Sequence, residues 1–175
     1  MDSRESPFRY AVDAGAFYTG FVFLSSTYQY LTSEAVFEEV KHIKRSQGAL
    51  EALLESNTLQ ILNSDRKNID KVVAAARRTG DYQKLSEADI SIIALALQLK
   101  IVLVTNDYAV ANVASTLKIP VKSVAGKGIV HIRRWILYCS ACGRVFGPNA
   151  KQCTLCGNRL RRKYKNLSER LKAFR

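Results

Sequence analysis

The chain has 175 residues, of which 47% are apolar, enough for one ordinary domain with a real core and a small appendage. No apolar run approaches the roughly 18 residues of a membrane-spanning helix, which excludes that class. The polar start, residues 1–7, predicts no signal peptide and hence a cytoplasmic protein, whose four cysteines are metal ligands rather than disulfides.

The net charge of +12 is concentrated at one end of the chain. Residues 1–128 hold 15 basic and 14 acidic side chains, whereas residues 129–175 hold 12 basic side chains and one acid, Glu169. A nearly neutral body with a strongly basic end predicts a polyanionic partner, most often nucleic acid. The alternative is a basic tail that only increases solubility.

Strands and helices are predicted to alternate along the body. The predicted strands are 8–13, 59–62, 101–105 and 120–124, and the predicted helices are 34–45, 48–56, 68–79, 86–99 and 107–117. Strand 101–105 is an uninterrupted β-branched run, typical of a parallel strand buried on both faces. Strands separated by helices imply an α/β domain with a mainly parallel sheet. The glycine-rich segment 126–128 marks its boundary.

Four acids stand at positions that suggest a shared site. Asp13 ends the first strand, and Asp107 follows the strongest strand by two residues. Ligands of open parallel sheets bind at the carboxyl edge of the strands, so we expect both carboxylates in one crevice. Asp89 lies in the first turn of a helix that is apolar all round, where an acid needs a reason.

The fourth acid, Glu39, is chosen from helix geometry. Apolar residues of helix 34–45 follow i, i+4, i+7 spacing and define a core-facing stripe. At about 100° per residue, Glu39 lies beside that stripe and is expected to point partly inward. Glu34 and Glu38 fall on the opposite side and are expected to be solvated.

Each acid also has a purely structural interpretation. Asp89 fits a capping box, Asp107 fits a helix cap, Asp13 fits a tight turn, and Glu39 fits an ordinary border position. Together, however, four clustered carboxylates repel one another and persist only beside a cation. Oxygen ligands favour Mg²⁺ or Mn²⁺.

Two Cys-x-x-Cys-Gly knuckles near the end of the chain predict a metal module. Their four thiols match the tetrahedral ligand set of Zn²⁺ and belong to Cys139, Cys142, Cys153 and Cys156. Four protein ligands leave no position for water, so this zinc is predicted to be structural. Strands are expected on either side, over 129–138 and 159–164.

The four acidic segments carry a family resemblance. Residues 10–13, 36–40, 85–90 and 103–108 resemble the four acidic motifs of PIN-domain nucleases, in order and spacing. The resemblance implies a divalent-metal-dependent endoribonuclease and a three-layer α/β/α fold. Residues 105–114 resemble the branch involved in small-subunit ribosome assembly. That branch usually has a hydroxyl residue after the first acid, whereas Ala14 and Gly15 follow Asp13 here.

With the four-cysteine ribbon added, the chain resembles archaeal members of the NIN-one-binding family, which trim the 3′ end of small-subunit rRNA. The resemblance implies a PIN-like nuclease domain over 1–126, a zinc ribbon over 127–165 and a basic tail over 166–175. It implies one structural Zn²⁺ and one or two catalytic Mg²⁺ or Mn²⁺ ions. The implied partners are precursor small-subunit rRNA, the pre-ribosomal particle and assembly-factor proteins, without a membrane.

The site assignment predicted from this resemblance has two parts. Asp13, Asp89 and Asp107 would hold the catalytic ions, and Glu39 would bind a second ion or orient the attacking water. RNA contacts are expected from basic residues of the ribbon: Arg133, Arg134, Arg144, Lys151, Arg159, Arg161, Arg162 and Lys163.

Three questions stay open at this stage. The chain also fits a toxin-type PIN ribonuclease acting on other RNA, against which the ribbon argues. It fits a non-catalytic RNA-binding assembly factor as well, against which the four acids argue. Trp135 suits either stacking on a base or packing the ribbon onto the body.

Overall fold

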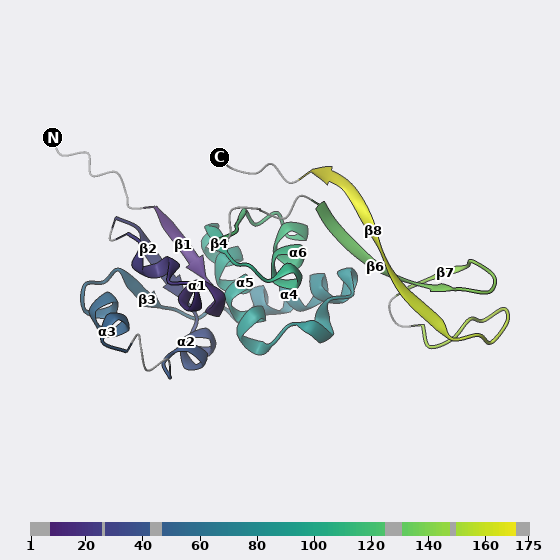
Figure 1. The fold of residues 1–175 in the computed structure, drawn as a ribbon, viewed down its shortest axis with the longest axis horizontal. Helices are drawn as coiled ribbons and strands as arrows, with labels where there is room; N and C mark the ends of the chain where they lie inside the picture. Colours follow the sequence, from purple (N-terminus) through teal and green to yellow (C-terminus); the bar gives the residue numbers. More distant parts are fainter. Residues whose placement is uncertain (1–7, 26, 43–46, 125–130, 148–149, 171–175) are drawn as a thin grey trace.

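The computed structural model describes residues 8–25, 27–42, 47–124, 131–147 and 150–170. For residues 47, 131–134 and 165–170 it describes the backbone alone. Its body is a five-stranded, wholly parallel sheet of order β3-β2-β1-β4-β5 (Figure 1). The strands are β1 (Arg9–Val12), β2 (Gln29–Thr32), β3 (Leu59–Ile61), β4 (Val102–Val104) and β5 (Val121–Lys122). The predicted mainly parallel α/β sheet is therefore confirmed.

Helices flank this sheet. They are α1 (Ala14–Tyr18), η1 (Phe21–Phe23), α2 (Glu34–Val40), α3 (Gln47–Glu55), α4 (Arg66–Thr79), η2 (Tyr82–Lys84), α5 (Glu87–Leu99) and α6 (Tyr108–Thr116). The apolar α5 packs against β1 and β4 and against the neighbouring helices α2, α4 and α6. Its side chains Ile92, Ile93 and Leu95 are fully buried, which explains why the helix shows no polar face.

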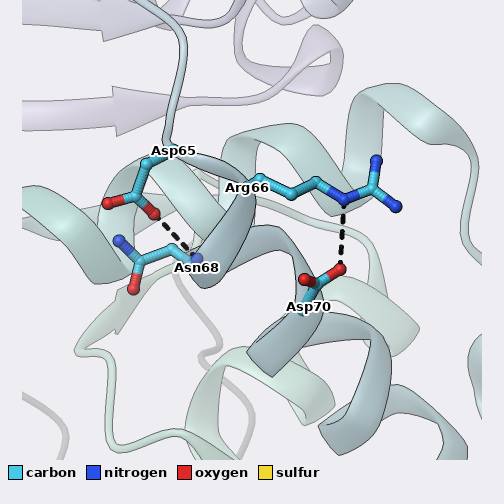
Figure 2. Close-up of polar contacts among 4 residues, drawn as sticks. All are labelled: Asp65, Arg66, Asn68 and Asp70. Carbon is cyan, nitrogen blue, oxygen red and sulfur yellow. Dashed lines mark hydrogen bonds and ion pairs between the residues drawn. The ribbon is translucent and has the colours of Figure 1, made fainter.

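The amphipathic helix α4 shows how acids serve ordinary structural roles in this chain (Figure 2). Asp65 caps the helix, with its Oδ1 accepting from the N–H of Asn68 at 2.8 Å. Arg66 pairs with Asp70 at 3.2 Å, and both side chains are well exposed. The helix ends at Gly80, whose φ of +80° suits glycine.

The structure also contains elements that the sequence did not predict. Strand β2 pairs in parallel with β1, and its residues Tyr30, Leu31 and Thr32 are all buried. A four-residue strand buried on both faces shows no polar alternation, so periodicity does not reveal it. Helix α1 was missed as well, and α2 ends at Val40 rather than residue 45.

A second sheet, of order β7-β6-β8, is antiparallel throughout. It comprises β6 (His131–Cys139), β7 (Val145–Phe146) and β8 (Leu160–Arg170). In Figure 1, β6 and β8 form a long arm beside the helical body, with β7 toward its far end. Strand β8 pairs with β6 from Leu160 to Arg170 and is therefore longer than the strand predicted over 159–164.

Trp135 joins the arm to the body. The Trp135 side chain packs against Gly80: a side chain at residue 80 would place its Cβ 3.1 Å from the Cβ of Trp135. The Arg162 guanidinium donates to the Gly80 carbonyl and lies 4.6 Å from the centre of the Trp135 ring. Lys84, from η2, lies 4.7 Å from the same ring. The packing alternative for Trp135 is therefore the one the structure shows.

None of the described helices has the length and hydropathy of a membrane span.

Candidate functional site

The centre of the parallel sheet brings two of the predicted acids together. Strand β1 pairs with β2 on one side and β4 on the other. From β1 the chain builds the sheet outward through β2 and β3, and it then returns to the opposite side of β1 to add β4 and β5. Asp13 follows β1, and its N–H donates to the carbonyl of Val104 in β4 at 3.3 Å. Asp107 follows β4 at the same edge. In open α/β sheets such a reversal forms the ligand-binding crevice.

Asp13 is only 6% exposed, and its Oδ1 accepts from the N–H of Ala16 at 2.9 Å. Burial raises the pKa of this carboxyl, while hydrogen bonds from the Thr105 hydroxyl and the Ala16 N–H oppose the rise. The charges of Asp89 and Asp107 raise the pKa further. Asp89 and Asp107 therefore lie near enough to Asp13 for their charges to act on it.

Thr105 links two of these acids and was missed by the sequence reasoning. Its buried Oγ1 accepts from the N–H of Asp107 at 3.0 Å, and its hydroxyl lowers the pKa of the Asp13 carboxyl. Neither Ala14 nor Gly15 offers a hydroxyl beside Asp13, and Thr105 supplies one from the neighbouring strand. The available signal was a hydroxyl residue at the end of the strongest predicted strand, two residues before Asp107.

Gly15 leaves room beside the first acid. A Cβ on residue 15 would stand 3.2 Å from Oδ1 of Asp13 and 3.6 Å from its Oδ2. A side chain there would crowd the carboxylate. Gly15, two residues after Asp13, therefore leaves space beside the Asp13 carboxylate.

Capping and clustering coexist in the same three acids. Asp107 accepts through Oδ1 from the N–H groups of Ala109 and Val110, at 2.6 and 3.0 Å. Asp89 accepts through Oδ2 from the N–H and hydroxyl of Ser86, at 2.8 and 2.9 Å, which completes the capping box. These contacts use one oxygen of each carboxylate, so they orient the group without excluding a cation from it.

Glu39 differs from the other three acids. It is exposed on α2, and its charge is not among those that shift the pKa of Asp13. The expected partial burial is therefore not found, because the two-turn α2 buries a narrow stripe at Val36 and Val40. Glu34 and Glu38 are exposed, as expected, and contact Asn63 and Lys41.

The cysteine cluster is more compact than the acidic edge. The Sγ atoms of Cys139, Cys142, Cys153 and Cys156 all lie within 4.8 Å of one another. Across the described residues, this is the only group of three or more ligand-bearing side chains that meets such a limit. Asp13, Asp89 and Asp107 do not meet this limit.

The sulfur geometry fits a tetrahedral metal. Sγ atoms of Cys139 and Cys156 are 3.5 Å apart, and those of Cys142 and Cys153 are 3.6 Å apart. A disulfide needs about 2.05 Å. Tetrahedral Zn²⁺ with Zn–S of about 2.3 Å separates its sulfurs by about 3.8 Å. The four thiols therefore fit one Zn²⁺ with small adjustments.

Backbone geometry prepares the thiols for metal. Gly143 and Gly157 adopt φ values of +70° and +68°, and their N–H groups donate to the carbonyls of Cys139 and Cys153 at 2.9 Å. An N–H of Cys142 lowers the pKa of the Cys139 thiol. For Cys153, burial raises the pKa, but the N–H groups of Cys156 and Leu155, together with the thiols of Cys156 and Cys142, bring it down to about 6. The pKa values of the Cys142 and Cys156 thiols are raised, in part by their contacts with Cys139 and Cys153.

The predicted RNA-contacting residues are spread over the ribbon. Six of them are exposed: Arg144, Lys151, Arg159, Arg161, Arg162 and Lys163. Lys163 lies 4.5 Å from the ring centre of Tyr138, and Arg162 makes the body contacts described above. The side chains of Arg133 and Arg134 lie outside the described part of the chain.

Comparisons with known proteins agree with this architecture. A family model described as "PIN domain of ribonuclease" matches residues 11–99. "Endoribonuclease Nob1" of Methanocaldococcus jannaschii is 32% identical over 154 residues, covering 87% of this chain and 76% of that protein. The protein of the same name from Methanothermobacter thermautotrophicus is 32% identical over 158 residues, covering 87% and 91%.

A yeast relative extends the comparison beyond archaea. "20S-pre-rRNA D-site endonuclease NOB1" of Saccharomyces cerevisiae is 34% identical over 79 residues, covering 45% of this chain and 17% of that protein. The two archaeal relatives match along most of their own length and most of this chain. The PIN-like body, the four-cysteine cluster and these matches lead to one conclusion: the chain belongs to the Nob1 family of PIN-domain endoribonucleases.

Proposed function

We propose that this endoribonuclease cuts precursor small-subunit rRNA near its 3′ end, during ribosome assembly in the cytoplasm. The printed name of the yeast relative, a 20S-pre-rRNA D-site endonuclease, supports this substrate. The observation that carries the proposal is the acidic edge, where the pKa of the buried Asp13 is raised by burial and by the charges of Asp89 and Asp107. Such a site binds cations, and a nuclease of this kind needs them.

Asp13, Asp89 and Asp107 would hold one or two Mg²⁺ or Mn²⁺ ions through their carboxylate oxygens. When bound, the metal supplies a water of lowered pKa and positive charge for the phosphate oxygens. Thr105 accepts from the N–H of Asp107 and lowers the pKa of Asp13, so it would help to hold the two acids together. The helix caps at Ala16 and Ala109 hold the same two carboxylates from the other side.

Glu39 keeps its proposed role as an outer ligand or water-orienting group. It is exposed on α2, which packs against both α1 and α5, the helices that begin at Asp13 and near Asp89. Its contribution is therefore expected to be smaller than that of the buried Asp13.

The ribbon has a separate task in this proposal. A single Zn²⁺ in the four-cysteine cluster would hold the two knuckles together and thereby fix the basic side chains around them. These side chains would grip the RNA backbone in a salt-dependent manner. We propose the division into a nuclease domain over 1–126, a ribbon over 127–165 and a basic end over 166–175, with assembly-factor proteins as further partners.

The test is cleavage of an RNA that spans the 3′ end of small-subunit rRNA, with and without Mn²⁺. We expect one metal-dependent cut by the wild type and none by Asp13→Asn. Asp70→Asn is the matched control, because Asp70 is an exposed acid of α4 that pairs only at the surface with Arg66 (Figure 2). Equal cleavage of unrelated RNA would replace the rRNA substrate by a general one, and full cleavage by Asp13→Asn would remove the acidic edge from the reaction.

A further inference from the structure

A pocket lies where the ribbon arm meets the nuclease body. Its volume is about 390 Å³, within the range of about 300–1,000 Å³ that small-ligand sites occupy. The residues that line it come from the end of α4, from η2 and from both long ribbon strands: Arg77, Gly80, Tyr82, Gln83, Trp135, Ile136, Leu137 and Arg162. The lining thus combines two guanidinium groups with two large aromatic rings and contains no acid.

Cations and rings are interleaved in this pocket. The Arg77 guanidinium lies 5.0 Å from the centre of the Tyr82 ring, and Arg162 lies 4.6 Å from that of Trp135. Lys84 lies 4.7 Å from the Trp135 ring, beside the pocket. Positive groups held over aromatic faces, with no carboxylate to neutralise them, favour an anionic ligand that also presents a flat ring.

The polar groups of the pocket are mostly donors. Arg77 and Arg162 offer only N–H groups, and one of those of Arg162 already donates to the Gly80 carbonyl. A ligand that suits these walls must therefore be rich in acceptors, as phosphate oxygens and base carbonyls are.

We propose that this junction pocket holds one nucleotide of a single-stranded RNA substrate, with its base against Tyr82 and its phosphate at Arg77 and Arg162. The proposal rests on the RNA-cleaving function argued above and names a second contact point for the same strand. Tyr82 suits the stacking role because its side chain is 39% exposed.

The pocket and the acidic edge are joined by a short stretch of chain. Tyr82 and Gln83 line it, and Ser86, three residues after Gln83, hydrogen-bonds the Asp89 carboxylate. Six residue steps from Gln83 to Asp89 limit the Cα separation to about 20 Å. A strand of a few nucleotides spans such a distance. One RNA segment can therefore contact the pocket and the acids together, which would set the register of the cut.

Trp135 makes the proposal directly testable, because it is the only tryptophan in the chain. Its fluorescence reports on this pocket alone. The full-length Asp13→Asn protein is titrated with a short single-stranded oligouridylate, and binding is followed in parallel by anisotropy of an end-labelled strand. We expect the Trp135 signal to change with the same midpoint as the anisotropy. Binding without any change in Trp135 fluorescence would overturn the proposal.

Two substitutions in the same background test the lining. We expect Arg77→Gln and Tyr82→Leu each to weaken binding roughly tenfold, the size of one lost base-stacking or phosphate contact. Arg78→Gln is the matched control, because Arg78 is exposed in the same last turn of α4 and does not line the pocket. It should leave the affinity within about threefold of the parent. Equal losses for Arg77 and Arg78 would reduce the pocket to general surface charge and contradict the proposal.

A further arm separates a strand-binding site from a free-nucleotide site. Uridine monophosphate should change Trp135 fluorescence only at far higher concentration than the oligonucleotide. Equal affinity for both would assign the pocket to a free nucleotide instead. Failure of the proposed rRNA function is distinguishable, because it would leave the precursor RNA uncut by wild type while these binding results stand. Normal cleavage of the precursor RNA by the wild type, without any change of Trp135 fluorescence on oligonucleotide binding, would instead refute only the proposed role of the pocket.

Discussion

The two candidate metal sites of this protein are built in opposite ways. The cysteine cluster comes from one short stretch, and its sulfurs lie within 4.8 Å of one another at positions preset by two knuckles. The acidic edge takes Asp13, Asp89 and Asp107 from elements far apart in the chain, and the fold of the whole body is what brings them near. Local spacing therefore creates the first site, and tertiary structure creates the second.

This difference has consequences for what each metal would do. A ribbon of this size buries little apolar surface, so its metal would contribute the folding energy of the module. The body has its own hydrophobic core around α5, so we expect it to fold without a cation. Removing the first metal should change structure, whereas removing the second should change only chemistry.

The largest expected effect separates chemistry from binding. Asp13→Asn should reduce metal-dependent RNA cleavage by at least about 100-fold. Replacing a residue that only hydrogen-bonds a metal ligand costs about 10- to 100-fold in activity, and Asp13 would be a ligand itself. RNA affinity should stay close to that of the wild type, since the basic ribbon is untouched. Single-turnover cleavage and filter binding on the same preparation check both halves. A parallel loss of affinity would mean that the acidic edge also grips the RNA.

The second effect breaks the ribbon and spares the body. Cys139→Ser should release Zn²⁺, unfold the ribbon and lower RNA affinity at least about tenfold, with a flatter salt dependence. Cleavage of a short unstructured RNA at high concentration should survive. Zinc content, affinity at two salt concentrations and cleavage are measured together. Ser140→Ala, in the same knuckle, serves as control, and unchanged affinity after zinc loss would make the ribbon a protein-docking module.

The third effect tests how the acids are held. Thr105→Val removes the hydroxyl that bonds Asp13 and accepts from the N–H of Asp107, so cleavage should fall about 10- to 100-fold. The Mn²⁺ concentration needed for half-maximal rate should rise, which a loss of overall stability would not produce. Thr105→Ser keeps the hydroxyl and should restore most of the activity. Equal defects in both variants would point to packing of the methyl group instead.

The smallest effect concerns stability. The pKa of Asp13 is raised in the fold, so the folded protein loses stability as pH increases from the ordinary carboxyl range through this raised pKa. Asp13→Asn should therefore raise the Tm of the protein without Mg²⁺ at pH 7, and much less near pH 4. Added Mg²⁺ should stabilise the wild type and leave the variant unchanged. Thermal melts across this pH range check it, and a pH-independent difference would contradict it.

Several residues show how far the sequence leads. Strand β4 and the four cysteines follow from local pattern, because a β-branched run and a knuckle spacing each need only neighbouring residues. Asp107 was predicted for the same reason, since it lies two residues after the predicted strand 101–105. Thr105 and the partners of Trp135 escaped notice, because their roles depend on contacts with residues distant in the chain.

The sequence by itself determined the alternation of strands and helices, the four-cysteine metal site and the basic character of the ribbon, because each depends on the order and spacing of nearby residues. The tertiary structure alone decided that β2 lies between β1 and β3, that Glu39 stays exposed, and that Thr105 joins Asp13 to Asp107. It also placed Trp135 between Lys84 and Arg162 at the junction of body and ribbon. Those outcomes depend on which distant segments compete for the same buried space, and no local pattern records that competition.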